Sequence, residues 1–292
     1  TLRQTRYGQV IGFRNESDSH TWMGIPYAKP PVGALRWKEA LMPEQWDGTL
    51  QALKAADFCK QIGSFGESRP PVELGKPIGS EDCLYLNIFA PRFGIDEIPR
   101  DENALPVMVY IHGGGNTAGY ANQLKYSGRN LAARHNVIVV NFNYRLGLFG
   151  WFSHPALNRR GSAEDRSILI PMMLALLAPK NTSNQRSIDS FGVDPDNVTL
   201  FGESAGGMNV FALLASPNAR GLFHKAIVQS GMPISIPLPQ AQNYIDADEP
   251  GSENSSREVM NKLLMSDGIV GSRVEAVRHQ NQMSDEGIAS YL

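Results

Sequence analysis

The chain has 292 residues, of which 42% are hydrophobic and 19% are charged, and its formal net charge is −2. This is an ordinary globular composition, and the lack of a basic excess argues against a nucleic-acid-binding surface. The longest apolar stretch, residues 168–178, is too short to span a bilayer and is interrupted by Pro171.

The first hundred residues predict short strands joined by turns and loops. Alternating apolar and polar residues, often β-branched or aromatic, indicate these strands. They are expected at residues 8–13, 21–26 and 84–90, and residues 92–103 are expected to form an exposed loop.

From residue 107 the pattern changes to apolar runs separated by helical segments. Buried strands are expected at residues 107–111, 137–142, 198–201 and 225–229, with a helix at 122–135. Continuous apolar strands alternating with helices are typical of a parallel sheet that is covered on both faces. The sequence therefore predicts an α/β fold with a mostly parallel central sheet.

The pattern weakens after residue 238. Residues 246–256 are acidic and polar, which predicts a loop, and residues 256–265 predict a short amphipathic helix. The polar stretch 274–282 is also helix-like. We expect residues 1–292 to form a single domain, incomplete at its C-terminal end because the last residues carry no helix stop or domain-closing feature.

Residues 201–207 fit G-x-S-x-G, the pattern of a nucleophile elbow centred on Ser204. A β-branched and aromatic run precedes it, and an apolar run of helix formers follows it. Side chains at Gly202 and Gly206 would clash where strand and helix approach each other. The Ser204 hydroxyl would lie at a helix N-terminus, where a developing negative charge is stabilised.

A second glycine-rich motif, His112 followed by three glycines, comes directly after the strand expected at 107–111. Backbone N–H groups at the C-terminal end of a core strand can bind the oxyanion of a tetrahedral intermediate. The N–H of the residue after the nucleophile, Ala205, would complete such a hole. Alone, a glycine run is usually only a flexible loop; together with the elbow it indicates acyl-transfer chemistry.

The two cysteines, Cys59 and Cys83, cannot form a zinc site alone, and no histidine lies at ligand spacing beside them. Their spacing leaves a disulfide and two buried free thiols equally open. No signal peptide begins the chain, so a cytosolic protein and an already processed one are both open. No cofactor and no metal ion are expected.

At this point the sequence resembles the type-B carboxylesterases, the cholinesterase-like branch of the α/β-hydrolases. The shared motifs run in order along nearly the whole chain, at residues 24–28, 30–36, 81–87, 112–115, 143–147, 202–207, 221–224 and 229–231. The resemblance implies an α/β-hydrolase fold and hydrolysis of small carboxylic esters through an acyl-enzyme on Ser204. The oxyanion hole would be formed by the N–H groups of Gly114, Gly115 and Ala205.

The resemblance also implies roles for residues around this site. Cys59 and Cys83 fall on the family's disulfide positions, which favours a bridge and a secreted or periplasmic location; a cytoplasmic one stays open. Glu203 and Ser230 look like groups that orient the acid and the histidine of a catalytic triad.

The base is where the chain departs from the family pattern. A serine needs a histidine oriented by a carboxylate, and in this fold the order is Ser, acid, His. Two histidines follow Ser204: His224, which we expect to be a strand-edge histidine, and His279. A compact triad of His279 with one of the preceding carboxylates stays open; these are Asp246, Asp248, Glu249 and Asp267. Otherwise the acid and the histidine are missing from this chain.

A second departure lies at residues 168–187. The family has a Gly-Asn-x-Gly-Leu-x-Asp motif and an amphipathic helix in this region, whereas this chain lacks the Gly-Leu-x-Asp part and has Pro171 and Pro179. Prolines inside a helix cost about 3 kcal/mol each. The sequence therefore leaves the packing beside the elbow strand in doubt.

Two alternatives to an esterase follow from the same motifs. One is a catalytically inert cholinesterase-like binding module, or an inactive fragment, although the serine and the oxyanion glycines are intact. The other is a shorter hydrolase of the hormone-sensitive-lipase type, against which the N-terminal motifs and the cysteine pair argue.

Overall fold

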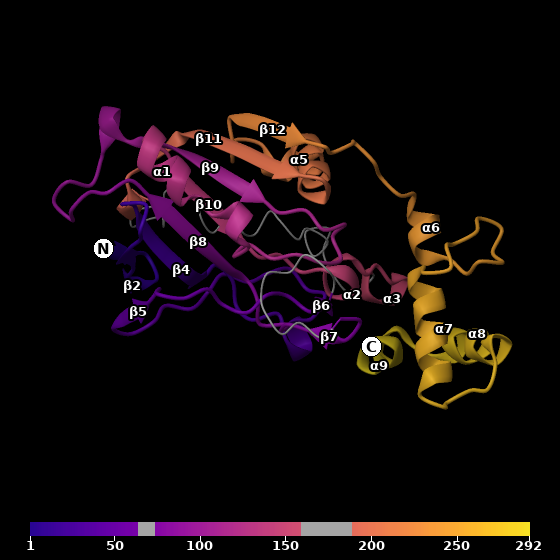
Figure 1. The fold of residues 1–292 in the computed structure, drawn as a ribbon. Helices are drawn as coiled ribbons and strands as arrows, with labels where there is room; N and C mark the ends of the chain where they lie inside the picture. Colours follow the sequence, from indigo (N-terminus) through magenta and orange to yellow (C-terminus); the bar gives the residue numbers. More distant parts are fainter. Residues whose placement is uncertain (64–73, 159–188) are drawn as a thin grey trace. The chain divides into compact units, whose positions relative to one another are not determined.

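The computed structural model describes residues 1–63, 74–158 and 189–292 (Figure 1). The chain divides into two compact units, and each is described by itself. The larger unit contains Thr1–Gly150 and Ser167–Pro233, and the smaller contains Trp151–Arg166 and Ile234–Leu292. The expected single domain stays a prediction. Our expectations for residues 168–187 lie outside the described residues.

A mixed sheet forms the centre of the larger unit. Among the described residues its strand order is β12-β11-β9-β10-β8-β4-β3. The strands are β3 (Phe13–Arg14), β4 (His20–Pro26), β8 (Tyr85–Ala90), β9 (Leu105–Ile111), β10 (Ile138–Phe142), β11 (Val193–Glu203) and β12 (Lys225–Gln229). Strands β9 to β12 pair in parallel, as predicted, and β8, β4 and β3 extend the sheet by antiparallel pairing.

Helices cover both faces of this sheet. Ala132 of α1 (Arg129–His135) packs on Val139 of β10, whereas Val210 of α5 (Ala205–Ala215) belongs to the cluster that contains Val140. Consecutive strand residues point to opposite faces, so the two helices lie on opposite sides of the sheet. The predicted two-sided α/β arrangement is confirmed.

The helix predicted at residues 122–135 is shorter than expected. A single 3-10 turn covers Leu124–Tyr126, and α1 begins only at Arg129. A Cβ placed on Gly128 would lie 2.5 Å from the Val139 Cβ. The chain therefore needs a glycine where it passes close to β10, and the helix starts after this close approach.

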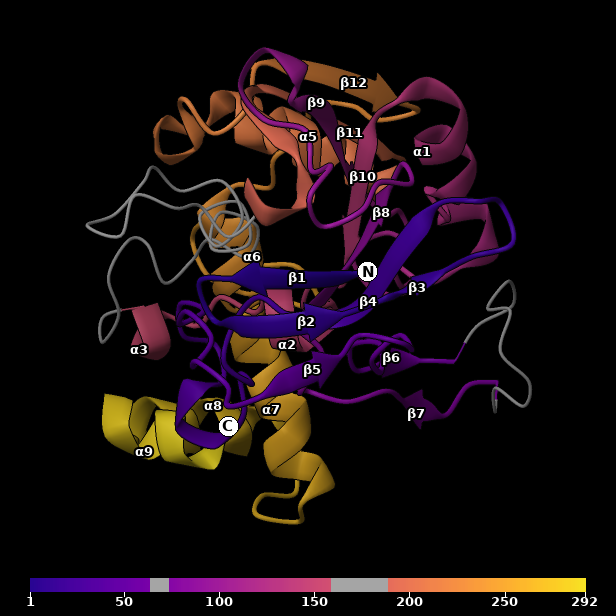
Figure 2. The same cartoon turned by 90° about the vertical axis from the view of Figure 1, so that its left-hand side faces the viewer.

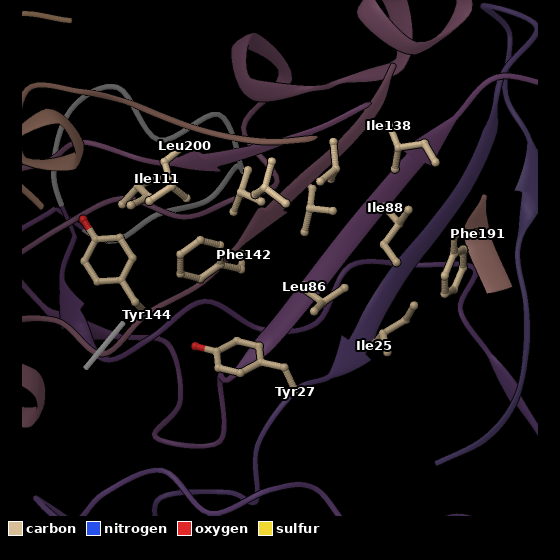
Figure 3. Close-up of a cluster of buried hydrophobic side chains, with 14 of the residues drawn as sticks. Ile25, Tyr27, Leu86, Ile88, Ile111, Ile138, Phe142, Tyr144, Phe191 and Leu200 are labelled. Atoms are coloured by element: carbon tan, nitrogen blue, oxygen red, sulfur yellow. The ribbon is translucent and has the colours of Figure 1, made fainter. Parts of the chain in front are cut away.

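The main core joins the sheet, α5 and the N-terminal region, and Figure 3 shows part of it. Phe142, Leu200 and Ile111 are fully buried, in line with the apolar runs that predicted their strands. Tyr144 follows β10 and points its hydroxyl toward the end of β9 at Ile111 (Figure 3). The core thus ends in polar groups at the edge where β9, β10 and β11 finish.

The N-terminal region adds two small sheets to the larger unit. Strands β1 (Leu2–Thr5), β2 (Gly8–Ile11) and β5 (Thr49–Gln51) lie side by side (Figure 2), and β6 (Gln61–Ile62) pairs with β7 (Pro77–Ile78). Cys59 and Cys83 form a disulfide beside β6. The bridge expected from the family resemblance is therefore present.

The smaller unit is helical where the structure describes it. Its helices are α3 (Pro155–Asn158), α6 (Leu238–Gln242), α7 (Ser256–Ser266), α8 (Arg273–Gln282) and α9 (Asp285–Tyr291). The side chains of Ser255, Ser272 and Ser284 accept hydrogen bonds from the first turns of α7, α8 and α9. These N-caps explain where the helices begin. The helices predicted at 256–265 and 274–282 are confirmed, and α9 was not predicted.

A short helix, α2 (Gly147–Trp151), lies at the junction of the two units along the chain. Within residues 1–63, 74–158 and 189–292, none of the helices combines the length and the apolar character needed to cross a bilayer.

Candidate active site

Ser204 is the single residue between strand β11 and helix α5. Its backbone has φ 55° and ψ −121°, a conformation that residues with a side chain rarely adopt. Two hydrogen bonds hold it there: the Ser204 N–H donates to the Gln229 carbonyl at 2.9 Å, and the Met208 N–H donates to the Ser204 carbonyl at 3.0 Å. This is the strand–turn–helix geometry that the sequence pattern predicts.

Glycines allow the strand, the turn and the helix to pack without side chains between them. A Cβ on Gly202 would lie 2.5 Å from the Gly206 carbonyl carbon, and a Cβ on Gly206 would lie 2.0 Å from the Ile111 carbonyl oxygen. Both distances are shorter than van der Waals contact. The steric reason inferred for these two glycines is therefore correct, and Gly206 also fixes α5 against the end of β9.

The glycine loop, residues 113–119, follows β9 and runs beside the elbow. In the sheet, Ile111 pairs with Gly202, so the chain that leaves β9 meets the chain that leaves β11. A Cβ on Gly113 would lie 2.9 Å from Glu203 Oε2 and 3.1 Å from the Ser204 Cβ. The structure thus brings the loop into contact with the serine and its neighbouring carboxylate.

Three backbone N–H groups, two in the glycine loop and one at the start of α5, are available as donors. Gly114 and Gly115 have φ angles of 107° and 62°, and neither N–H donates to an acceptor in the described part of the chain. Ala205 is the first residue of α5, where a helix supplies no partner for the N–H and carries partial positive charge. This arrangement suits a developing oxyanion, and the oxyanion-hole role of the three residues stays a prediction.

Buried aromatic side chains support the start of the glycine loop. His112 is 1% exposed, and its ring stacks on Tyr144 with a centroid distance of 4.3 Å. Its Nδ1 lies 2.8 Å from the Gly113 carbonyl, and the Tyr144 hydroxyl donates to the His112 carbonyl at 2.7 Å. Burial lowers the pKa of His112 to about 4, so the ring is neutral at pH 7.

The residues expected to orient a triad lie on both sides of the elbow. Glu203 ends β11, and Ser230 follows β12 with an exposed side chain and a φ of 51°. Ser230 comes directly after Gln229, whose carbonyl holds the Ser204 backbone. Their proposed orienting roles stay predictions.

His224 is held at the opposite end of this strand pair. Its Nδ1 accepts a hydrogen bond from the Val198 N–H at 3.2 Å, and its side chain is exposed. The register pairs Thr199 with Lys225 and Glu203 with Gln229. At about 3.3 Å per residue, His224 is therefore about 16 Å from the Ser204 end of the strands. It is a strand-edge histidine, as expected.

His279 belongs to the smaller unit and is half-buried on α8. Two of its candidate carboxylates are bound elsewhere: Asp246 accepts two hydrogen bonds from Arg273, and Asp267 accepts one from Tyr291. Asp248 and Glu249 are exposed. The described residues include no hydrogen bond between His279 and these four carboxylates, so the compact triad stays a hypothesis.

Proteins of known sequence resemble this chain over most of its length. It is 45% identical to para-nitrobenzyl esterase of Bacillus subtilis (strain 168) over 237 residues, which are 81% of this chain and 45% of that protein. It is 40% identical to juvenile hormone esterase of Tribolium castaneum over 80% of this chain and 37% of that protein. Acetylcholinesterase of Danio rerio is 39% identical over 78% of this chain and 35% of its own length.

Solved structures agree with the fold. A thermophilic PNB esterase matches all of this chain with a TM-score of 0.71 and 36% identity, over 53% of its own length. The predicted α/β-hydrolase fold is thereby confirmed. The chain spans about half the length, or less, of the relatives it matches. Since the carboxylesterase family model matches residues 1–265, the chain belongs to the carboxylesterase family.

Proposed function

We propose that this chain carries the nucleophile and the oxyanion hole of a serine carboxylesterase. The observation that supports this most directly is the strained elbow at Ser204, in contact with a glycine loop in which the Gly114 and Gly115 N–H groups donate to no acceptor among the described residues. The proposed substrates are small carboxylic esters. Esterases among the relatives support this substrate class, and no cofactor is needed for the reaction.

In the first half of the reaction, the Ser204 Oγ attacks the ester carbonyl carbon. The negative charge that forms on the carbonyl oxygen is stabilised by the N–H groups of Gly114, Gly115 and Ala205. The alcohol then leaves with a proton, and the acyl group stays on Ser204. Water attacks this acyl-enzyme in the second half and releases the carboxylic acid.

A base must take the proton of the Ser204 hydroxyl during the attack. We propose that this base is a histidine oriented by a carboxylate, and that both residues lie outside residues 1–292. His224 lies too far from Ser204 along the strand pair, and two of the carboxylates near His279 in sequence are bound elsewhere. Loss of triad members typically lowers the rate on the order of 10⁴- to 10⁶-fold. We therefore expect slow acylation by this chain.

The test is the release of p-nitrophenol from p-nitrophenyl acetate and butyrate by residues 1–292. We expect a slow release of about one equivalent, which is lost in Ser204→Ala. The matched control is Ser216→Ala, which removes a hydroxyl at the other end of α5 and leaves the release unchanged. Equal release from the parent and Ser204→Ala would contradict an active elbow. Sustained turnover would place the base within the chain, and His279→Gln would then be the next variant.

We also infer that the protein works in an oxidising compartment, as a secreted or a periplasmic protein. The Cys59–Cys83 disulfide supports this location, because cytosolic reductants keep thiols reduced.

A further inference from the structure

Gly114 and Gly115 carry two of the proposed oxyanion donors, and the contacts of Gly114 are within the glycine loop itself: its carbonyl accepts from the Thr117 and Ala118 N–H groups at 3.1 and 3.0 Å. Both glycines are exposed, and in the described part of the chain the one atom within 4 Å of a Cβ placed on Gly115 would be Thr117 Oγ1, at 3.6 Å. Residues without side chains cannot hold their own position by packing. Where these two glycines lie relative to Ser204 therefore depends on contacts of the residues around them, and on the C-terminal side the first such residue is Asn116.

Asn116 is the first residue after these glycines and is joined to α5. Its Oδ1 accepts a hydrogen bond from Asn209 Nδ2 at 2.9 Å. The Tyr144 hydroxyl lies 3.3 Å from the same oxygen, but it has one proton and donates over 2.7 Å to the His112 carbonyl. Asn209 is therefore the main donor to Asn116. The Asn116 carbonyl also accepts from the Gly147 N–H at 2.7 Å.

Asn209 is placed rigidly with respect to the nucleophile. It lies on α5, which begins immediately after Ser204, and its side chain is 2% exposed. Five residues along a helix correspond to about 7.5 Å, so the distance from Ser204 to Asn209 is set by regular helix geometry. A hydrogen bond from Asn209 to the loop therefore holds Gly114 and Gly115 at a set distance from Ser204.

The backbone of Asn116 also suits an asparagine. Its φ is 57°, in the left-handed region that asparagine tolerates better than most residues with a side chain. The position therefore combines a turn that ends the glycine run with a side chain that reaches the nucleophile helix. A glycine would satisfy the turn alone, and it would lose the connection to α5.

We propose that the hydrogen bond from Asn209 to Asn116 fixes the two oxyanion glycines at their distance from Ser204. Asn116 and Asn209 are then positioning residues for ester hydrolysis, an inference that rests on the function proposed above. Neither side chain needs to touch the substrate. Their effect is to keep the N–H groups of Gly114 and Gly115 directed at the carbonyl oxygen while the charge develops on it.

The variants that test this are Asn116→Gly, Asn209→Ala and the double variant. Asn116→Gly keeps the backbone conformation possible and leaves α5 unchanged, so it remains informative if Asn209→Ala does not fold. Asn136→Gly is the matched control, since Asn136 also has a positive φ, of 49°, but ends α1. Leu214→Ala, at an exposed position of α5, is the control for a change in that helix.

The first measurement is amide hydrogen exchange at Thr117 and Ala118, whose N–H groups both donate to the Gly114 carbonyl; it uses the whole 292-residue chain and requires no turnover. We expect exchange about tenfold faster in each single variant, and no further increase in the double variant, because both changes remove the same bond. Exchange in β8 of these variants should match exchange in β8 of the parent. In the two control variants, exchange in the glycine loop should also match the parent. Unchanged exchange in both single variants, or additive effects in the double variant, would overturn the proposal.

The second measurement is the rate of acylation of Ser204 by p-nitrophenyl butyrate. We expect the rate at saturating ester to fall about tenfold in each single variant, while the half-saturating concentration stays the same. This is less than the 10²- to 10³-fold typical of a lost oxyanion donor. Faster exchange with an unchanged acylation rate would refute the positioning role. If the parent itself shows no Ser204-dependent acylation, the proposed function fails, and the exchange data alone decide whether the bond holds the loop.

Discussion

Gln61 and Gly119 exchange two hydrogen bonds across 58 residues of sequence. The Gly119 N–H donates to Gln61 Oε1 at 2.8 Å, and Gln61 Nε2 donates to the Gly119 carbonyl at 3.0 Å. The same Nε2 also lies 3.0 Å from the Cys59 carbonyl, and the Gln61 side chain is 7% exposed. One buried side chain thus joins the glycine loop to the segment that the disulfide anchors.

We expect Gln61→Leu to destabilise the larger unit by about 3 kcal/mol. The substitution leaves the N–H and the carbonyl of Gly119 buried without partners, and each such group costs about 1–3 kcal/mol. Urea unfolding measures this loss. The control is Gln51→Leu on an exposed position of β5, where we expect a change within about 0.5 kcal/mol. Equal effects of the two substitutions would show that the contacts with Gly119 contribute nothing.

Neighbouring glycines of α5 should differ sharply in their tolerance of a side chain. A Cβ on Gly206 would lie 2.0 Å from the Ile111 carbonyl oxygen, whereas the nearest atoms to a Cβ on Gly207 are 3.1 Å away. We expect Gly206→Ala to lower the free energy of unfolding by about 3 kcal/mol or more, because the helix must move away from β9. Gly207→Ala should cost clearly less. Thermal unfolding followed by circular dichroism compares the two, and the reverse order would contradict the close approach at Gly206.

The sequence predicts those parts of the fold that depend on neighbouring residues. Apolar runs identify β9, β10 and β12, and the glycine pattern predicts the turn at Ser204 together with its steric cause. In each case the residues that decide the structure lie within a few positions of one another, so a short pattern is sufficient.

Contacts between distant segments are not visible in such patterns. Nothing around Gln61 indicates that its side chain binds Gly119, and the late start of α1 follows from the approach of Gly128 to β10. The hydrogen bond between Asn116 and Asn209 joins two positions that are 93 residues apart in the sequence. Asn116 directly follows the glycine run, and this position is the one local sign of its role.

Stability of the larger unit should fall as the pH is lowered from 7 to 5. Burial lowers the pKa of His112 from the usual 6.5 to about 4, so the unfolded chain takes up a proton that the folded chain excludes. The contribution of the neutral ring is complete above about pH 6.5 and is lost as the pH falls toward 4. At pH 5 the loss is about 2 kcal/mol, since one pKa unit corresponds to about 1.4 kcal/mol.

The variant that tests this origin is His112→Gln. It should be less stable than the parent at pH 7 because it disrupts a packed site, and this difference should shrink by about 2 kcal/mol at pH 5. Urea unfolding at the two pH values measures the change, with His135→Gln at the exposed end of α1 as the control. A difference that is the same at both pH values would exclude His112 as the source.

In the smaller unit, Arg273 should be most important at neutral pH. Its guanidinium donates to both oxygens of Glu258, at 2.9 and 2.5 Å, and to both oxygens of Asp246. Glu258 is 4% exposed, and the bonds from Arg273 are the main cause that lowers the pKa of its carboxyl group. In the parent, this contribution is complete above the ordinary glutamate pKa of about 4.3 and is lost as the pH falls below it.

Arg273→Met should reverse this dependence on pH. The Glu258 carboxylate would then be buried without a cation, so its pKa would rise above the ordinary value. Breaking a buried pair costs about 3–5 kcal/mol, and we expect about 2 kcal/mol at pH 7 because Arg273 is 30% exposed. Amide exchange in α7 measures the loss within this unit. The loss should become smaller at pH 5, where the unpaired carboxyl group takes up a proton.

Two further variants separate the buried pair from the exposed one. Adding Glu258→Gln to Arg273→Met removes the unpaired charge, so the double variant should be more stable at pH 7 than Arg273→Met alone. Asp246→Asn removes only the exposed partner and should have a much smaller effect. If Asp246→Asn destabilised α7 as much as Arg273→Met, the exposed carboxylate would be the important partner, and the buried charge of Glu258 would not explain the stability of this unit.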